Sequence, residues 1–315
     1  VRVYKNISGT WTQLGSDING EAAYDYSGIR GSVSLSSDGT IVAIGAPFND
    51  GGGDASGHVR VYDWDGNDWN LLGAEIDGEA ADDYSGYSVS LSSDGTIVAI
   101  GAYENDGTAT NAGHVRVYQY SGGTWTQLGA DIDGEGSWAK SGYSVSLSSD
   151  GTIVAIGAQF DDGGGDASGH VRVYEYSGST WTKIGADIDG EAAGDQSGSS
   201  VSLSSDGTIV AIGAILNDGG GSNSGSVRVY KNISGTWTQL GSDINGEAAN
   251  DYSGSSVSLS SDGTTVAIGA FLNDGGGDAS GHVRVYEYVG SSWIQYIDDI
   301  DGEGDGDYFG YSVSL

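Results

Sequence analysis

The chain has 315 residues, including 57 glycines, one proline, no cysteine and no methionine. The absence of cysteine excludes a disulfide scaffold, cysteine-ligated zinc and thiol catalysis. A net charge of −33, from 44 acidic against 11 basic residues, excludes nucleic acid and anionic lipid as partners. No apolar run approaches the roughly 20 residues that span a membrane, so membrane insertion is not expected either.

One strand-like string, Val-Arg-Val-Tyr, occurs six times. Its copies begin at Val1, Val59, Val115, Val171, Val227 and Val283. Successive starts are therefore 58 and then four times 56 residues apart. A fixed period of this size is typical of a ring or stack of identical supersecondary units. We therefore treat residues 1–315 as a single repeat domain, whose last unit is incomplete.

The unit that begins at Val59 predicts four short strands in chain order. They cover residues 59–62, 69–72, 88–91 and 97–102, and an acidic loop over residues 74–86 separates the second from the third. Asp94-Gly95 between the last two runs is a strong hairpin signal. Four antiparallel strands per unit, repeated around an axis, describe a β-propeller. We predict an all-β, six-bladed propeller of four-stranded blades.

Counting the runs tests whether this ring closes. There are six Val-Arg-Val-Tyr runs, six tryptophan runs and six Ser-Val-Ser-Leu runs, but only five runs of the Ile-Val-Ala-Ile type. Six blades would thus close with one strand lacking after Leu315. A longer array of the repeat is the alternative that these counts leave open.

Residues that recur in every unit are expected to be structural. The recurring tryptophans should pack between blades, and the arginine of Val-Arg-Val-Tyr should pair with an acid or stack on an aromatic ring. Four histidines share one position, with a serine in the remaining complete unit, and we expect a structural contact there. These positions are Trp11, Trp69, Trp125, Trp181, Trp237 and Trp293; Arg2, Arg60, Arg116, Arg172, Arg228 and Arg284; and His58, His114, His170, Ser226 and His282.

Several motifs resemble the FG-GAP repeats of integrin-α-type β-propellers, in a variant found in large microbial surface proteins. They are Phe309-Gly310-Tyr311-Ser312-Val313, then Gly45-Ala46-Pro47, and then Gly57-His58-Val59-Arg60-Val61-Tyr62. The resemblance implies extracellular adhesion or ligand binding and a cell-surface location. Many such repeats hold calcium in the hairpin before Gly-Ala-Pro. Here that hairpin is reduced to Ser36-Ser37-Asp38-Gly39, so this site cannot be transferred.

The acidic loops are the best metal candidates, with calcium as the expected ion. Their oxygens at positions 1, 3, 5 and 9 match the start of an EF-hand-like spacing, although position 12 is a glycine. The alternative is that these acids cap turns. The candidates are Asp17, Asn19, Glu21 and Asp25; Glu75, Asp77, Glu79 and Asp83; Asp187, Asp189, Glu191 and Asp195; and Asp243, Asn245, Glu247 and Asp251.

Residues that break the repeat are the candidates for binding an individual ligand. Most lie after Gly-Ala or in the altered third acidic loop, hence on one face of the propeller. Aromatic side chains there could stack on sugar or contact a partner protein, and neutral variation of a tolerant loop is the alternative. They are Phe48, Tyr103, Glu104, Trp138, Lys140, Phe160 and Phe271.

These observations predict a non-enzymatic extracellular propeller for surface adhesion or for binding a surface protein or glycan. The second hypothesis is a self-associating structural subunit of a filament or coat. The third is a glycosidase-type enzyme that uses acidic pairs. No Ser-His-Asp or metal-hydrolase constellation can be assembled from the sequence, so catalytic residues are not predicted.

Overall fold

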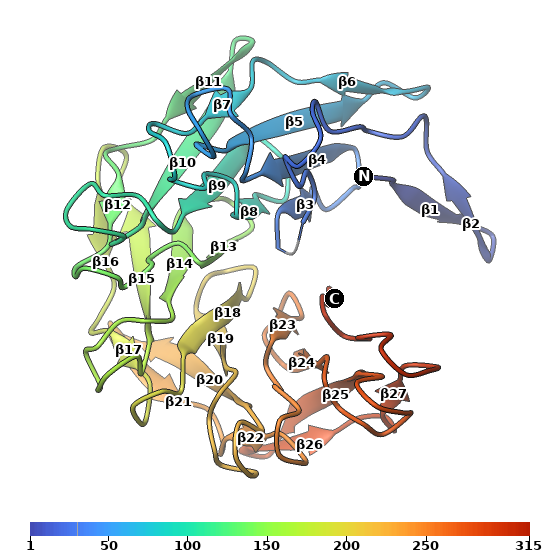
Figure 1. Ribbon diagram of the computed structural model, residues 1–315, viewed down its shortest axis with the longest axis vertical. Helices are drawn as coiled ribbons and strands as arrows, with labels where there is room; N and C mark the ends of the chain where they lie inside the picture. Colours follow the sequence, from blue (N-terminus) through green and yellow to red (C-terminus); the bar gives the residue numbers. More distant parts are fainter. Residues whose placement is uncertain (30) are drawn as a thin grey trace.

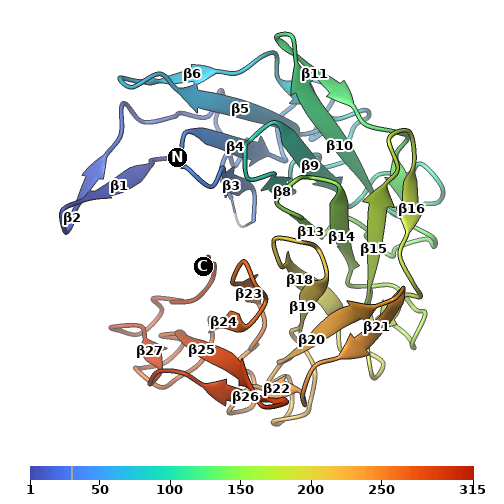
Figure 2. The same ribbon diagram turned by 180° about the vertical axis from the view of Figure 1, so that it is seen from behind.

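A computed structural model describes residues 1–29 and 31–315, which form 27 strands. Six antiparallel sheets surround a central axis, as Figures 1 and 2 show from opposite sides. The predicted six-bladed β-propeller is confirmed. Within the described residues, no helix has the length and apolar character that crossing a membrane requires.

Five of the sheets share one strand order, which in the first is β3-β4-β5-β6 with β7 beside β5. The innermost strands are β3 (Val33–Leu35), β8 (Ser88–Leu91), β13 (Ser144–Leu147), β18 (Ser197–Leu203) and β23 (Ser256–Leu259). The second strands are β4 (Ile41–Ala46), β9 (Ile97–Ala102), β14 (Ile153–Ala158), β19 (Ile209–Ala214) and β24 (Thr265–Ala270). The third strands are β5 (His58–Trp64), β10 (His114–Ser121), β15 (His170–Tyr176), β20 (Ser226–Ile233) and β25 (His282–Val289).

The outermost position of each blade is divided between two strands, where the sequence predicted one. The longer are β6 (Trp69–Leu71), β11 (Thr124–Gln127), β16 (Trp181–Lys183), β21 (Thr236–Gln239) and β26 (Ser292–Gln295). The shorter are β7 (Ile76–Asp77), β12 (Ile132–Asp133), β17 (Ile188–Asp189), β22 (Ile244–Asn245) and β27 (Ile300–Asp301). β7 pairs His58 with Asp77 and Val59 with Ile76. Ile76 is buried, and this apolar anchor draws the start of the acidic loop into the sheet.

The sixth sheet contains β1 (Tyr4–Ile7) and β2 (Thr10–Gln13). Leu315 at the other end of the chain donates its backbone N–H to Ser258 Oγ, as Leu259 does to Ser202 Oγ. The final residues therefore follow the pattern of an innermost strand. In Figure 1 the two ends of the chain face each other across this part of the ring. The arrangement agrees with the predicted ring that is short of one strand.

The hydrophobic core lies between blades. In one cluster, Val59 and Val61 of β5 pack with Val98 and Ile100 of β9 in the next blade, and all four are almost fully buried. Burying each such side chain stabilises the fold by about 1.5–3 kcal/mol. A blade therefore depends on its neighbour for most of its core.

The repeated tryptophans join consecutive blades, as predicted. Trp125 Nε1 donates to Leu72 O at 2.7 Å, and Trp181 Nε1 donates to Leu128 O at 2.7 Å. Trp69, Trp237 and Trp293 make the corresponding bonds. Trp11 in the two-stranded sheet is instead 68% exposed.

The Asp-Gly hairpins form as predicted and also link the blades. Asp94 Oδ1 accepts hydrogen bonds from Ser92 Oγ at 2.7 Å and from Thr96 N at 2.9 Å. Gly95 takes the left-handed conformation that this turn needs, with φ 71°. Ser93 N then donates to Ser149 O in the next hairpin at 2.8 Å. Each turn is thus bonded within itself and to its neighbour.

Glycines in the second strands permit the close approach of neighbouring blades. A Cβ placed on Gly101 would collide with Gly142 O and Ser88 Oγ. The same collision with a glycine carbonyl occurs at Gly45, Gly157, Gly213 and Gly269. This contact explains why the strand motif ends in Ile-Gly-Ala in all five copies.

We predict that Gly101→Ala lowers the free energy of unfolding by at least about 1–3 kcal/mol, because backbone atoms of two blades must move apart. Chemical denaturation followed by circular dichroism measures the change. Gly136→Ala is the matched control, since a Cβ there meets no atom within 4 Å. Equal stability of the two variants would contradict this packing account.

Candidate metal sites between the blades

The described residues contain three clusters in which one histidine and two carboxylates bring their donor atoms within 4.8 Å of one another. We number the five junctions between consecutive blades by the residue that begins the third strand: His58, His114, His170, Ser226 and His282. The clusters lie at the first, second and fifth junctions. They are Glu21, His58 and Glu75; Glu79, His114 and Asp131; and Glu247, His282 and Asp299.

Each cluster takes its ligands from two consecutive repeats. At the first junction, Glu21 comes from the loop between β2 and β3, and His58 begins β5. Glu75 lies just before β7, which pairs with the first two residues of β5. The divided outer strand therefore places this carboxylate beside the histidine of its own blade, while the preceding loop supplies the other.

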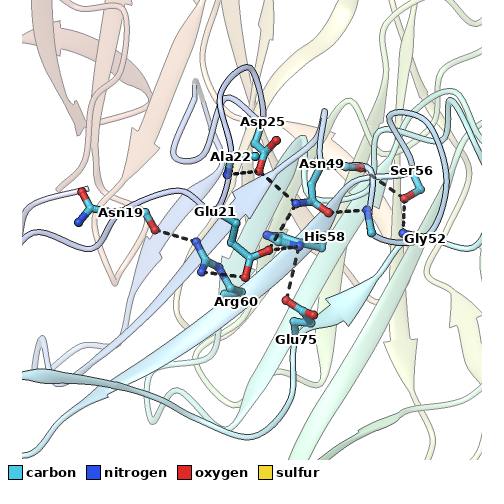
Figure 3. A network of polar contacts seen from close by, with 11 residues as sticks. Asn19, Glu21, Ala22, Asp25, Asn49, Gly52, Ser56, His58, Arg60 and Glu75 are labelled. Atoms are coloured by element: carbon cyan, nitrogen blue, oxygen red, sulfur yellow. Dashed lines mark hydrogen bonds and ion pairs between the residues drawn. The ribbon is translucent and has the colours of Figure 1, made fainter.

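The histidine of the first cluster is buried and faces two exposed carboxylates. His58 Nδ1 lies 3.8 Å from Glu21 Oε2 and 3.7 Å from Glu75 Oε2. Both separations exceed hydrogen-bond length. The side chain of His58 is 2% exposed, whereas those of Glu21 and Glu75 are 44% and 42% exposed. Figure 3 shows both carboxylates turned toward the imidazole ring.

Burial keeps these imidazoles neutral. It lowers the pKa of His58 and of His282, and lowers the pKa of His114 to about 4, with a further contribution from the nearby arginine in each case. A neutral imidazole does not balance two carboxylates, but it offers one nitrogen lone pair to a metal ion. The carboxylates at each cluster therefore need another positive charge.

The arginine two residues after each junction residue supplies part of that charge. Arg60 Nη1 lies 3.3 Å from Glu21 Oε1, and Arg60 Nη2 donates to Asn19 O at 2.9 Å. The guanidinium also lies over the Tyr62 ring at 5.7 Å. The predicted acid pairing and aromatic stacking of this arginine are both present. The contacts with Glu21 and Asn19 hold the acidic loop against the next blade, whereas Tyr62 lies on the same strand as Arg60.

The EF-hand-like interpretation of the acidic loops does not match this geometry. Glu21, Glu75, Glu79 and Glu247 do take part in clusters. However, positions 1 and 5 of one loop do not converge. Position 5 of one loop, such as Glu79, meets position 1 of the next loop, here Asp131. The reason is that each loop crosses from one blade to the next, so its two ends belong to different junctions.

The other predicted ligands have structural partners. Asp25 Oδ2 accepts hydrogen bonds from Ala22 N and Asn49 Nδ2, which Figure 3 shows beside the first cluster. Asp83, Asp195 and Asp251 repeat this cap. Asp77, Asp189 and Asn245, like Asn19, offer their backbone carbonyls to the arginine of the next blade. The rest pair with side chains: Asp17 with Arg2, Asp187 with Lys183, Glu191 with Arg228, and Asp243 with Gln239.

Sequence reasoning missed five members of the clusters: His58, His114, His282, Asp131 and Asp299. The histidines were compared only with one another, and a ring does hold them apart. The sequence feature that could have identified the clusters is the offset, in residues, between an acid of one repeat and the histidine of the next. That offset becomes meaningful only once the packing order of the blades is known.

The predicted ligand-binding residues partly gather. Lys140 Nζ pairs with Glu104 Oε1 at 3.0 Å and lies 5.2 Å from the Tyr103 ring and 5.4 Å from the Phe160 ring. Phe48 joins this group through Tyr84, which stacks on Tyr103. Phe271 contacts a separate aromatic group, and Trp138 is 57% exposed. Ligand binding by these residues stays a prediction.

Comparison with known proteins agrees with this architecture. Residues 76–118, 183–230 and 245–286 match the family model described as FG-GAP repeat. These three stretches therefore match FG-GAP repeats, and the predicted resemblance to these repeats is confirmed. No curated protein sequence matches the chain.

Solved structures with a similar fold include three with enzyme names. Periplasmic gluconolactonase PpgL from Pseudomonas aeruginosa has TM-score 0.62 and 16% identity, covering 96% of this chain and 79% of that one. A putative 6-phosphogluconolactonase from Bacteroides uniformis has TM-score 0.53 and 13% identity, covering 93% and 89%. Hydrazine synthase from Kuenenia stuttgartiensis has TM-score 0.51 and 14% identity, covering 89% and 69%.

These neighbours overturn the predicted function, which was adhesion or ligand binding by a non-enzymatic extracellular propeller, and we do not retain that function. The same fold carries proteins named as lactonases, so fold and motif order do not separate binding from catalysis. The expectation that the chain is not an enzyme loses its support for the same reason. At these identities the likeness establishes the fold alone.

We predict that in the metal-free protein His114 stays neutral until the pH falls to about 4. An unfolded histidine gains its proton near pH 6.5, so stability should decline as the pH falls from about 6.5 towards 4. NMR titration of the imidazole nitrogens measures the midpoint, and the His114→Ser spectrum assigns the signal. A midpoint near 6.5 would contradict the burial of this ring.

Proposed function

We propose that this chain is a divalent-cation-binding β-propeller that holds its ions at the junctions between blades. The observation that carries the proposal is the buried, neutral His58 facing Glu21 and Glu75 at distances too long for hydrogen bonds. Equivalent clusters occur at two further junctions. An ion there would bind one blade to the acidic loop that enters from the preceding one.

The donor set fits a first-row transition metal ion such as Zn²⁺ or Mn²⁺. Ligand distances of about 2.0–2.2 Å place neighbouring donor atoms roughly 3–4 Å apart, close to the separations found at His58. Calcium, the ion expected from the acidic loops, prefers six to eight oxygen ligands. An imidazole nitrogen with two carboxylates suits Zn²⁺ or Mn²⁺ better, and calcium is the alternative occupant.

The extracellular or cell-surface location remains part of this proposal, and the FG-GAP repeats support it. The predicted partners, a surface protein or glycan, and self-association stay predictions. Metal binding does not depend on them.

The chain itself offers a test variant, because Ser226 occupies the histidine position at the fourth junction. We predict that His58→Ser, His114→Ser and His282→Ser each abolish the binding of one Zn²⁺ equivalent or lower its affinity at least about 100-fold, since a ligand is lost. Isothermal titration measures stoichiometry and affinity, with Mn²⁺ and Ca²⁺ as competing probes.

His170→Ser is the matched control, because His170 Nδ1 lies 3.0 Å from Asp161 Oδ1 and belongs to none of the clusters. Its Zn²⁺ binding should equal that of the unaltered chain. Absence of binding of any of the three ions by the unaltered chain would refute the proposal. Binding of Ca²⁺ alone would show that the sites hold calcium and not a transition metal ion.

A second candidate function, hydrolysis of an uncharged sugar lactone at the second junction, is favoured by a cavity beside that cluster. The cavity has a volume of about 540 Å³, and its lining includes Glu79, Tyr84, Glu104 and Asn111. A bound divalent ion would supply polarisation of a carbonyl and a water of lowered pKa. Glu104 is held by Lys140 and Asn111, so its position is fixed for contacting a polyhydroxy substrate.

The negative charge of the cavity favours uncharged lactones over phosphorylated ones. Among the described residues that line it, Glu79, Asp82, Asp83, Glu104 and Asp106 are acidic and none is basic. Such a surface repels anions, so a phosphorylated lactone is disfavoured and an uncharged one is admitted. The named activities of the two lactonase neighbours support testing this class.

We predict that the Zn²⁺-loaded chain hydrolyses glucono-1,5-lactone faster than buffer and loses this activity in His114→Ser but not in His58→Ser. A pH-indicator assay measures the rate, with the 6-phosphorylated lactone as the anionic comparison. A rate equal to spontaneous hydrolysis would refute the lactonase candidate and leave the metal proposal standing.

A further inference from the structure

The third junction carries the two junction carboxylates but has a lysine between them. Glu135 and Asp187 lie 56 residues after Glu79 and Asp131, the two acids of the second cluster. Lys183 Nζ is 2.7 Å from Asp187 Oδ1 and 3.9 Å from Glu135 Oε1. The ammonium thus contacts both carboxylates that would otherwise face a metal ion.

The lysine is a departure from the repeat. The corresponding residues at the second, fourth and fifth junctions are Gln127, Gln239 and Gln295, and each donates its amide N–H to the neighbouring aspartate at 2.6 Å. A glutamine leaves the charge of that aspartate unbalanced. An ammonium group neutralises the charge of the aspartate, so no ion from solution is needed to neutralise it.

The histidine of this junction is withdrawn from the carboxylates as well. His170 Nδ1 lies 3.0 Å from Asp161 Oδ1. At the other four junctions the position of Asp161 is an asparagine: Asn49, Asn105, Asn217 and Asn273. Those asparagines bind the capping aspartate of the acidic loop, as Asn105 binds Asp83. Here that aspartate is replaced by Ala139, so the carboxylate has moved to Asp161, beside the histidine.

The fourth junction has lost its nitrogen ligand instead. Ser226 stands where the other junctions have histidine. Burial and the neighbouring Asp243 raise the pKa of Glu191, which fits two carboxylates that face each other without a sufficient cation. Arg228 is 3.9 Å from Glu191, a longer separation than at the other four junctions.

We infer that the chain binds three divalent ions, at the first, second and fifth junctions, and that Lys183 occupies the place of the ion at the third. This inference rests on the proposed metal binding. It assigns Lys183 as the residue that keeps metal from the third junction. At the third junction the ammonium of Lys183 links the two loops, so this link does not depend on the metal concentration.

The test gives the third junction the residues of the second through Ala139→Asp, Asp161→Asn and Lys183→Gln in one variant. Isothermal titration with Zn²⁺ should then show four equivalents in place of three. The reverse variant, Gln127→Lys, places an ammonium at the second junction and should show two. Circular dichroism establishes that both variants are folded, and hydrogen exchange with and without Zn²⁺ locates the affected loops.

The outcomes separate the two proposals. No Zn²⁺ or Mn²⁺ binding by the unaltered chain contradicts the proposed function. Three equivalents in the unaltered chain and also in both variants, all folded, overturns the role of Lys183 alone. Zn²⁺-dependent protection around Glu135 and Asp187 in the unaltered chain would overturn it as well, because the lysine would then have failed to exclude the ion.

Discussion

The structure depends on the contact between the arginine of each junction and the acidic loop of the preceding repeat. From the first junction to the fifth, the guanidinium of this arginine binds a carbonyl of the preceding loop at 2.8–2.9 Å and faces the glutamate that follows. A hydrogen bond to a charged group contributes about 1.5–3 kcal/mol. In a chain of net charge −33, this contact holds an acidic loop against the next blade and sets its glutamate beside the junction residue.

The same constraint explains why the junctions differ. One guanidinium does not neutralise the two carboxylates at each junction. The remaining negative charge is compensated differently from one junction to the next. Three copies present a neutral histidine and an arrangement suited to a divalent ion. One uses the ammonium of Lys183, and one leaves Glu191 with a raised pKa beside Asp243. Near-identical repeats therefore need not have equal functions, because two or three substitutions change how the charge is met.

Local features of the fold could be predicted from the sequence, whereas features formed between repeats could not. The Asp-Gly hairpins follow from short-range turn chemistry, and the alternating runs follow from strand periodicity. Pairing of Glu79 with His114 and Asp131 depends on which loop crosses to which blade. Spacing within one loop suggested an EF-hand-like site, whereas the clusters found among the described residues combine acids of two loops. Function was mispredicted for another reason. Adhesion was inferred from the resemblance to FG-GAP repeats, but proteins named as lactonases have the same propeller fold.

The most direct test is a crystal structure of the Zn²⁺-loaded chain with anomalous difference maps recorded on both sides of the zinc absorption edge. The account predicts zinc peaks beside His58, His114 and His282, each contacted by two carboxylates from consecutive repeats. It also predicts no peak beside His170, where Lys183 lies between Glu135 and Asp187. Peaks confined to the acidic loops away from the histidines, or a peak that displaces Lys183, would contradict it.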